Sequence, residues 1–308
     1  MTELDDELKP EILILGAGGH LGAELCRQLP EDKFFAKNHE VLDITKFGAV
    51  EILIKSLHPK IIINCAATSS FRRNEVHSRE HLAVNSEAVA NLAKACRIYG
   101  CNLIHISDAE VFGGSRLVPH SEYDCIAPLD VYALSKAAGE HAILAVNGLR
   151  DPGTELNYWI IRSSMICGRL SRPTGLYYLG GILHSSRIPV QIPENVYRSP
   201  LRAATLATEI LWLAHNLTKV PSGIYHVASA DHGNLLEIAR QFAANLPDNR
   251  FDQIKPTVDN NVGSLGAFWP RNGALNTRAW CEVTGRTLPP WLAEIRAYAQ
   301  DFKKHYNH

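Results

Sequence analysis

The two side chains best suited to chemistry are Tyr132 and Lys136, in the segment DVYALSK that starts at Asp130. This segment continues as AAGEHAILAV and predicts a helix, so the phenol and the ammonium lie one turn apart on one face. A phenol titrates at about pH 10, but a neighbouring ammonium favours the phenolate and moves that pKa toward neutrality. The pair can therefore act as a general acid. The pattern Y-x-x-x-K also occurs by chance, and the alternative is an exposed tyrosine over a lysine stem.

Two more polar residues, Ser107 and Asp108, follow the apolar segment that begins at Asn102. The sequence NLIHIS predicts a strand that ends in polar side chains. In parallel α/β sheets, ligands bind outside the carboxyl ends of the strands. We therefore expect Ser107 and Asp108 to share a site with Tyr132 and Lys136.

A glycine-rich turn near the start of the chain predicts where a cofactor would bind. Four apolar residues, Ile12–Leu15, run into glycines at 16, 18, 19 and 22, and the helical pattern ELCRQL follows. A pyrophosphate bound at the first N–H groups of a helix tolerates no Cβ in its way. Gly16, Gly19 and Gly22 fit the tight turn, the backbone approach and the helix packing of a dinucleotide site. The alternative is an ordinary turn between a strand and a helix.

The residues after the predicted second strand, Lys33–Ala36, bear on the choice of cofactor. A site that prefers NAD(H) usually carries a carboxylate about 20 residues beyond the glycines, where it binds the ribose 2′-hydroxyl. This chain has Lys37, Asn38 and His39 instead. A cation and an amide tolerate a 2′-phosphate, so we predict NADP(H) rather than NAD(H). The alternative is a solvated surface turn.

Strands and helices alternate through the first half of the chain. Residues 61–67 predict a central buried strand, and Tyr158 begins another. A helical pattern spans 78–99 and ends at Gly100, and its buried stripe is predicted to contain Leu82, Val89, Leu92 and Ala93. This alternation predicts an α/β fold with a doubly wound parallel sheet, the Rossmann fold.

The second half alternates less regularly. Short strands are expected at 190–192 and 224–227, and helices at 201–215, 235–244 and 291–304. We therefore expect an NAD(P)-binding domain in residues 1–165 and a smaller substrate-binding lobe in residues 166–308, with segments near 188–230 returning to the first domain.

Composition narrows the class of protein. The 308 residues include 31 Lys and Arg against 32 Asp and Glu, so the charge balance favours neither nucleic acid nor a membrane surface as a partner. The acidic start has no apolar segment, and no apolar run approaches membrane-spanning length, so we expect a cytoplasmic protein. Seven cysteines without a C-x-x-C pair indicate neither a disulfide framework nor a metal site.

The chain resembles the extended short-chain dehydrogenase/reductases, and among them the dTDP-4-dehydrorhamnose reductase family. The resemblance runs from Ile12 to about Tyr298. It rests on the motifs GAGGHLG, VLDIT, INCAA, AVN, VYALSKAAGE, IIRSS, SGIYHVAS and WPRNGALNT, followed by LPPW.

This resemblance implies roles for individual residues. The pyrophosphate would be held by Gly16, Gly19, His20 and Leu21. Asp43 and Ile44 would border the adenine, and the ribose would be flanked by Cys65, Ala66 and Ala67. Asn85 of the AVN motif joins the cofactor site, together with Lys37 and Asn38. Tyr132 would be the acid, and Lys136 would order the phenol and the nicotinamide ribose. The substrate would be bound by Ser69, Phe71, Met165 and Arg271.

One departure from the family pattern falls at the catalytic hydroxyl. The family reads S-T-D-Y-V-F where this chain reads SDAEVF from Ser107, so Asp108 takes the position of a threonine or serine. An ionised aspartate would repel a developing alkoxide and would donate a proton only if its pKa were raised. Ser107 is a substitute donor, although neighbouring residues of a strand point to opposite faces. Met165 and Cys167 also replace a family aromatic and a tyrosine.

We predict an NAD(P)H-dependent oxidoreductase that reduces a nucleotide-activated 4-keto-6-deoxy sugar. The departure at Asp108 leaves two alternatives open. One is an NADP-binding regulatory subunit without turnover, like the beta subunit of methionine adenosyltransferase, and the other is a nucleotide-sugar epimerase that retains its cofactor. By analogy with the extended family, the chain is expected to form a homodimer.

Overall fold

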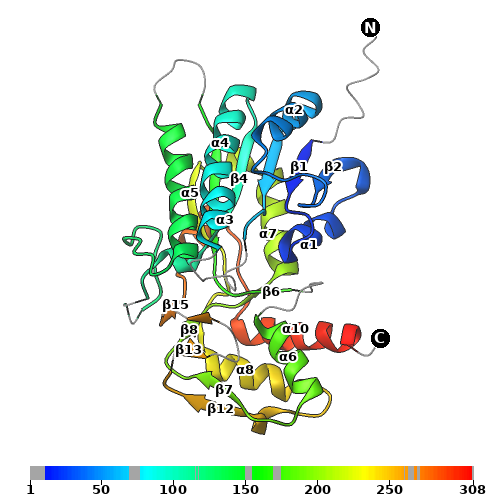
Figure 1. Ribbon diagram of the computed structural model, residues 1–308, viewed down its shortest axis with the longest axis vertical. Helices are drawn as coiled ribbons and strands as arrows, with labels where there is room; N and C mark the ends of the chain where they lie inside the picture. The colour runs from blue at the N-terminus through cyan, green and yellow to red at the C-terminus, as the bar shows by residue number, and fades with distance from the viewer. Residues whose placement is uncertain are drawn as a thin grey trace. The chain divides into compact units, whose positions relative to one another are not determined.

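The computed structural model describes residues 11–68, 77–114, 116, 118–149, 155–168, 175–259, 261–262, 267–268 and 271–306. The chain divides into two compact units (Figure 1). The first comprises 1–107, 130–161 and 207–224, and the second comprises 108–129, 162–206 and 225–308. The sequence predicted one boundary near residue 165 and a return near 188–230. In the structure, residues 108–129 also belong to the second unit.

The first unit is built on a six-stranded sheet in the order β10-β5-β4-β3-β1-β2. Its strands are β1 (Ile12–Leu15), β2 (Phe34–Lys37), β3 (Ile61–Asn64), β4 (Asn102–Asp108), β5 (Tyr158–Ser163) and β10 (Gly223–His226). β1 pairs in parallel with both β2 and β3, so that Ile14 lies between Ala36 and Ile63, and β3 pairs in parallel with β4. The predicted doubly wound α/β fold is confirmed.

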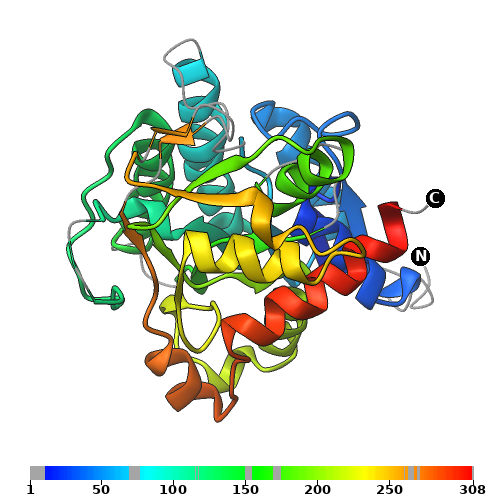
Figure 2. The same cartoon turned by 90° about the horizontal axis from the view of Figure 1, so that it is seen from below.

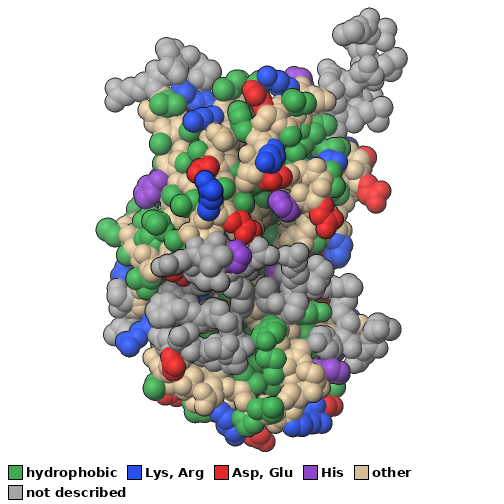
Figure 3. Space-filling view, in the orientation of Figure 1, with side chains coloured by type: hydrophobic (Ala, Val, Ile, Leu, Met, Phe, Trp, Pro, Cys, Tyr) green, Lys and Arg blue, Asp and Glu red, His purple; other side chains and the backbone are tan. Residues whose placement is uncertain are grey.

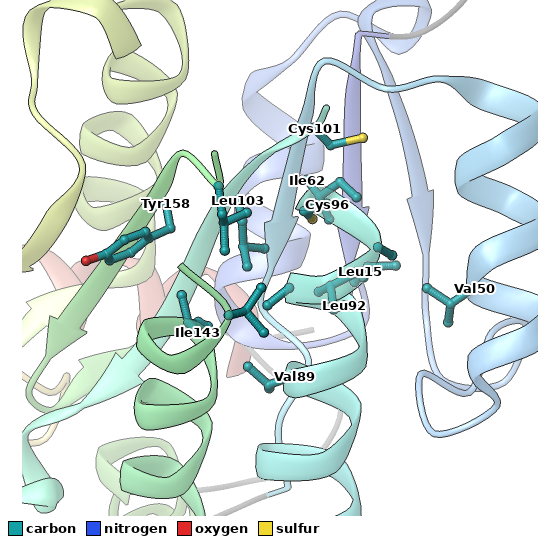
Figure 4. Packing of buried hydrophobic residues seen from close by; sticks show 14 of the residues in the cluster. Leu15, Val50, Ile62, Val89, Leu92, Cys96, Cys101, Leu103, Ile143 and Tyr158 are labelled. Atoms are coloured by element: carbon teal, nitrogen blue, oxygen red, sulfur yellow. The ribbon is translucent and has the colours of Figure 1, made fainter. Parts of the chain in front are cut away.

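One face of this sheet packs against a layer of helices. These are α2 (Phe47–Leu57), α3 (Ser78–Leu82), α4 (Ala88–Tyr99) and α5 (Val131–Asn147). Alternate strand residues such as Leu15, Ile62 and Leu103 are buried against Val89 and Ile143 of the helices (Figure 4). The period-two alternation of the strands and the apolar stripes of the helices meet in this core. The unit also contains α1 (His20–Gln28) and, from α7 (Ala203–His215), residues 207–215.

The predicted helix over 78–99 is divided by a π-helical turn, η3 (Ala83–Glu87), between α3 and α4. The wider turn inserts about one residue into the helical repeat. The predicted buried stripe is therefore wrong at one position: Leu82 is 37% exposed, and His81 is fully buried instead. Val89, Leu92 and Ala93 are buried as predicted, and Gly100 ends α4 in the left-handed conformation.

In its described residues, the second unit combines short strands with the helices α6 (Gly175–Ser185), α8 (Leu235–Ala244), α9 (Arg278–Thr284) and α10 (Trp291–Tyr306) and with the first residues of α7. Its strands are β6 (Ile166–Cys167), β7 (Val190–Pro193), β8 (Tyr197–Arg198), β9 (Leu201–Arg202), β11 (Gly233–Asn234), β12 (Ile254–Thr257), β13 (Asn261–Val262), β14 (Ala267–Phe268) and β15 (Asn272–Gly273). Figure 2 shows α8 and α10 side by side, and Phe242 of α8 packs against Tyr298 and Phe302 of α10.

A buried acid anchors α10 within the second unit. Glu294 accepts hydrogen bonds from the Arg202 backbone N–H at 2.7 Å and from the Thr205 hydroxyl at 2.8 Å. Its other oxygen lies 3.4 Å from Nε of Arg202. A buried carboxylate is stable only with such partners, so this cluster fixes the start of α10 against the end of β9 and the first residues of α7.

The surface carries charges of both signs. On the face drawn in Figure 3, basic, acidic and histidine side chains are scattered among apolar ones. Among the described residues, no helix has both the length and the apolar character needed to cross a bilayer.

Candidate active site

The glycine-rich turn connects β1 to α1, as predicted. Gly16 has a φ of +78°, and a Cβ there would lie 2.5 Å from the backbone nitrogen of Ala66. A Cβ on Gly22 would lie 2.3 Å from the carbonyl oxygen of Gly16. Both contacts are with backbone atoms, which cannot yield as a flexible side chain can. The fold itself therefore requires glycine at positions 16 and 22.

Gly19 differs from these two glycines. A Cβ on Gly19 would meet only the carbonyl oxygen of Gly16, at 3.4 Å, and the residue has an ordinary extended conformation. It is the N-cap of α1, and as a glycine it has no side chain to cap the helix. The fold would accommodate a Cβ at position 19, yet the chain has glycine there. An anion held by the first amides of α1 would account for the missing side chain.

Not every amide of the turn is available to a ligand. The N–H groups of Gly16 and Ala17 donate to the Lys37 carbonyl oxygen at 3.0 and 3.1 Å. These two bonds fasten the turn to the end of β2. The Gly19 N–H is engaged as well, since it donates to the Gly16 carbonyl oxygen at 3.1 Å. An anion at this turn would therefore be bound by the amides of His20 and Leu21, the first residues of α1.

The hydrogen bonds to Lys37 also bring the segment 37–39 to the turn. A Cβ on Gly18 would lie 3.4 Å from Cβ of Asn38, so that side chain borders the glycines. Oδ1 of Asn38 accepts a hydrogen bond from the Val41 N–H at 3.1 Å. The NH2 group of the same side chain is the donor that could bind an anion. The Lys37 ammonium lies 4.4 Å from the centroid of the Phe35 ring, and His39 is exposed.

The residues expected around the adenine and ribose lie beyond β2 and β3. Asp43 accepts hydrogen bonds from the Thr45 amide and hydroxyl. Partial burial opposes ionisation, but these bonds, with the charges of His39 and Lys46, hold its pKa below the usual value. Ile44 is buried in the core. After β3, Cys65 and Ala66 are half-buried and Ala67 is exposed. Burial raises the pKa of the Cys65 thiol, which favours its protonated form.

Tyr132 and Lys136 are both buried, at 5% and 3% exposed, so an exposed tyrosine over a lysine stem is ruled out. Asp130 caps α5 by accepting a hydrogen bond from the Ala133 N–H at 2.8 Å, which fixes where the helix begins. Lys136 Nζ donates to the Ile106 carbonyl oxygen at 2.6 Å. Its charge also disfavours protonation of His105, whose pKa burial already holds well below the usual value. The ammonium therefore lies near the carboxyl end of β4.

Ser107 and Asp108 diverge. The Ser107 hydroxyl donates to Glu140 on α5, and both side chains are buried. Asp108 belongs to the second unit, where its Oδ1 accepts a hydrogen bond from the Glu110 N–H at 3.0 Å at the start of the 3-10 turn Ala109–Val111. The donated hydrogen of Ser107 is thus committed within the fold. As a substitute for the missing family hydroxyl, Ser107 would first have to give up its bond to Glu140.

Asn85 is buried in the π-helical turn. Its amide nitrogen donates to Thr68 Oγ1 and to Ser135 Oγ, both at 2.9 Å, and its Oδ1 accepts from the Thr68 N–H at 3.1 Å. It therefore holds the segment after β3 against α5. Its expected contact with a cofactor stays a prediction. Sequence reasoning missed the other members of this network, Thr68, His81 and Ser135; the AVN motif marked only Asn85.

The substrate residues expected from the resemblance are found in several places. Ser69 and Phe71 lie outside the described residues. Met165 and Arg271 belong to the second unit, where Met165 is half-buried and Arg271 is exposed. Their carbonyl oxygens accept hydrogen bonds from Leu201 and Tyr197, respectively.

The second unit also contains a buried aromatic and histidine cluster that the sequence did not predict. Phe112 stacks on His120 at 4.3 Å and meets His226 edge to face, and the Arg162 guanidinium lies 5.0 Å from the same ring. Burial, and next the Arg162 charge, lower the pKa of His226 to about 3. The folded protein therefore keeps His226 neutral at pH values where an unfolded chain would protonate it.

Comparisons with known proteins agree with the geometry. A model of the RmlD substrate binding domain family matches residues 10–304. The chain is 31% identical over 293 residues to the dTDP-4-dehydrorhamnose reductase of Streptomyces griseus, with 93% of this chain and 92% of that protein covered. It is 28% identical over 288 residues to the dTDP-4-keto-6-deoxy-D-glucose reductase of Streptomyces niveus, with 92% and 94% covered.

A solved structure shows the same fold. It is the dTDP-4-dehydrorhamnose reductase of Bacillus anthracis in complex with NADP. The TM-score is 0.81 at 23% identity, and the match covers 95% of this chain and 99% of that one.

Proposed function

The chain belongs to the RmlD substrate binding domain family, and from that premise we propose that it reduces a dTDP-linked 4-keto-6-deoxy sugar with a nicotinamide cofactor. One observation carries the proposal. The first unit contains both the glycine-rich turn that leads into α1 and the buried pair Tyr132 and Lys136, which lie one helical turn apart on α5. Binding of a dinucleotide and transfer of a proton are the two functions that such a reductase needs.

The residues present fit a dinucleotide. Gly19, His20 and Leu21 would receive the pyrophosphate, because position 19 is kept free of a Cβ that the fold would tolerate. Asp43 and Ile44 would border the adenine, and Cys65, Ala66 and Ala67 the ribose. A reduced nicotinamide bound in this way supplies the hydride for the carbonyl carbon.

We further propose that the cofactor is NADP(H). The side chain beside the glycines is Asn38, an amide where a carboxylate would exclude a 2′-phosphate. Its Oδ1 accepts a hydrogen bond from the Val41 N–H, so the side-chain NH2 group is the donor that we assign to the 2′-phosphate. The Lys37 ammonium, one residue earlier, adds a positive charge to the same segment.

Tyr132 supplies the proton in the proposed reaction. Its phenolic hydrogen goes to the carbonyl oxygen of the sugar as hydride reaches C4, so the ketone becomes a secondary alcohol and the phenol becomes a phenolate. The Lys136 ammonium on the next turn of α5 stabilises that phenolate. Burial strengthens the attraction, because water screens the two charges less than it would at the surface.

On the substrate side, we propose that Ser69, Phe71, Met165 and Arg271 contact the sugar nucleotide. Asp108 stands where the family places a hydroxyl donor. As an ionised carboxylate it would not stabilise an alkoxide, so in this chain the burden of charge stabilisation falls on Tyr132 and Lys136. We expect the turnover number to be lower than that of an otherwise equal Asp108→Thr variant.

The test is a substrate panel. Purified protein is mixed with NADPH and with dTDP-4-dehydrorhamnose or dTDP-4-keto-6-deoxy-D-glucose, and cofactor oxidation is followed by absorbance while the product is identified by NMR. A nucleotide-linked 6-deoxyhexose with a new 4-hydroxyl supports the proposal. Tight NADPH binding without oxidation of cofactor across the panel contradicts it and favours a regulatory subunit.

A further inference from the structure

His81 is a buried polar residue in the first unit that the mechanism above does not use. It lies on α3, fully buried, at a position where an apolar side chain would avoid desolvation of the imidazole. Its Nδ1 forms a hydrogen bond with the Thr68 hydroxyl. Its ring meets the ring of Tyr132 edge to face, with centroids 5.7 Å apart and planes inclined by 73°. His81 therefore connects the segment after β3 to the phenol on α5.

Thr68 is bonded to both Asn85 and His81. The Thr68 backbone N–H donates to Oδ1 of Asn85, which fixes the orientation of that amide. The two hydrogens on the Asn85 nitrogen then go to the hydroxyl oxygens of Thr68 and Ser135. The Thr68 hydroxyl has one donor hydrogen and two acceptor lone pairs, so it accepts from Asn85 and still forms a hydrogen bond with Nδ1 of His81. Asn85 and Thr68 together therefore hold Nδ1 of His81 in place.

The same network reaches Tyr132 from its other side. The Ser135 hydroxyl, which accepts from Asn85, donates to the Tyr132 carbonyl oxygen at 2.7 Å. Ser135 thus fixes the backbone of the tyrosine and His81 contacts its ring. The helices α3 and α5 that carry these groups lie side by side in one layer of the first unit (Figure 1).

We propose that His81 is a positioning residue for Tyr132. Held through Nδ1 by Thr68, the imidazole restrains the phenol ring in the orientation from which it donates its proton. The inference rests on the proposed function, because it assigns Tyr132 the role of acid. A positioning role and a purely structural role make different predictions. Only a positioning role links His81 to the orientation of the Tyr132 ring and to the rate at which Tyr132 transfers its proton.

The experiment compares four forms of the full chain: wild type, His81→Ala, His81→Phe and Val89→Ala. The His81→Phe variant keeps an aromatic ring beside Tyr132, whereas His81→Ala removes it. Val89 is a fully buried residue of α4 in the same core, so Val89→Ala controls for lost packing alone. Thermal unfolding is recorded for all four, and every other measurement is made below the lowest transition.

The first measurement needs no turnover. In protein with 13C-labelled tyrosine, the Cζ resonance of Tyr132 is assigned by its loss in Tyr132→Phe. We expect His81→Ala to shift this resonance by more than its line width, His81→Phe to shift it less, and Val89→Ala to leave it near the wild-type position. In a histidine 1H–15N spectrum, Thr68→Val should shift the Nδ1 resonance of His81, because it removes the hydrogen-bond partner of that nitrogen. An unchanged Cζ resonance in His81→Ala, or an unchanged Nδ1 resonance of His81 in Thr68→Val, overturns the inference.

The second measurement is kinetic. We expect His81→Ala to lower kcat by about tenfold or more with little change in NADPH affinity, because small misplacements of a reacting group are amplified in the rate. His81→Phe should recover part of that loss, because it keeps the ring beside Tyr132 but lacks the hydrogen bond to Thr68. Equal kcat values for His81→Ala and Val89→Ala overturn the inference while leaving the proposed function intact. Absence of turnover in the wild type overturns the proposed function, whereas the resonance of Tyr132 still decides the role of His81.

Discussion

The substitution Gly19→Ala separates what the fold needs from what a ligand needs. The added methyl group would meet one protein atom, the Gly16 carbonyl oxygen, at 3.4 Å, and the backbone conformation there suits alanine. We therefore expect the free energy of unfolding to change by no more than about 1 kcal/mol, with the weaker N-cap offset by reduced freedom of the unfolded chain. In a dinucleotide site, by contrast, the methyl group would stand between the amides of α1 and the pyrophosphate.

The expected loss of binding follows from the bonds at risk. A hydrogen bond to a charged group contributes about 1.5–3 kcal/mol, and each 1.4 kcal/mol corresponds to about tenfold in affinity. Losing one amide–phosphate bond should thus weaken NADPH binding by roughly 10- to 100-fold. Binding is measured by titrating NADPH fluorescence, and stability by urea unfolding of the same preparation.

Gly22→Ala is the matched control. Its Cβ would lie 2.3 Å from the Gly16 carbonyl oxygen, so the backbone must move and we expect a loss of about 1–3 kcal/mol in stability. If Gly19→Ala binds NADPH as tightly as the wild type, the assignment of the pyrophosphate to α1 is wrong. If it unfolds as readily as Gly22→Ala, the distinction between the two glycines is wrong.

Three further predictions concern cofactor choice and stability. Asn38→Asp should weaken NADPH binding at least tenfold and reduce the ratio of NADPH to NADH affinity, because a carboxylate repels a 2′-phosphate and accepts a hydrogen bond from a 2′-hydroxyl. Equal NADPH affinities of the variant and the wild type would exclude Asn38 from the site. His226 has a pKa lowered by burial and by Arg162 to about 3, below the unfolded value of about 6.5, so its stabilising contribution is full above about pH 6.5 and is lost as the pH falls toward 3. In urea unfolding between pH 7 and 5, His226→Asn should therefore lose about 2 kcal/mol less than the wild type does, and parallel losses would refute the buried neutral imidazole. Glu294→Ala should destabilise the protein by about 2–4 kcal/mol, because it leaves Arg202 and Thr205 without their buried acceptor; urea midpoints that coincide with the wild type would show that this cluster does not anchor α10.

Local patterns made much of the first unit predictable. The glycines and the Tyr132/Lys136 pair are defined by spacing along a few neighbouring residues, and the structure places both within the first unit. The parallel sheet followed from alternating strands and helices, and four apolar residues sufficed to locate β1 and its turn. The structure adds what a pattern lacks, such as the use of the Gly16 amide to bind β2 rather than a ligand.

The parts that sequence reasoning missed depend on packing across the fold. The π-helical turn changed which residue faces the core, so His81 was overlooked in favour of Leu82. Ser107 was considered as a donor to substrate, but its partner Glu140 lies far along the chain on α5. In the second unit, α6 was missed because its sequence, GLYYLGGILHS, is rich in glycine and has low helix propensity. The burial of His81 and the bond between Ser107 and Glu140 are set by tertiary structure and leave no periodic pattern in the sequence.

We propose that a buried phenol on α5 protonates a keto sugar while a dinucleotide is held at the N-terminus of α1. This is tested by the rate of NADPH oxidation by Tyr132→Phe and wild type at saturating dTDP-4-keto-6-deoxyhexose, with NADPH affinity measured for both. We expect Tyr132→Phe to have a rate lower by at least about 100-fold and an affinity within about twofold of the wild type, since only the proton donor is removed. Equal rates for the two proteins would show that Tyr132 is not the proton donor.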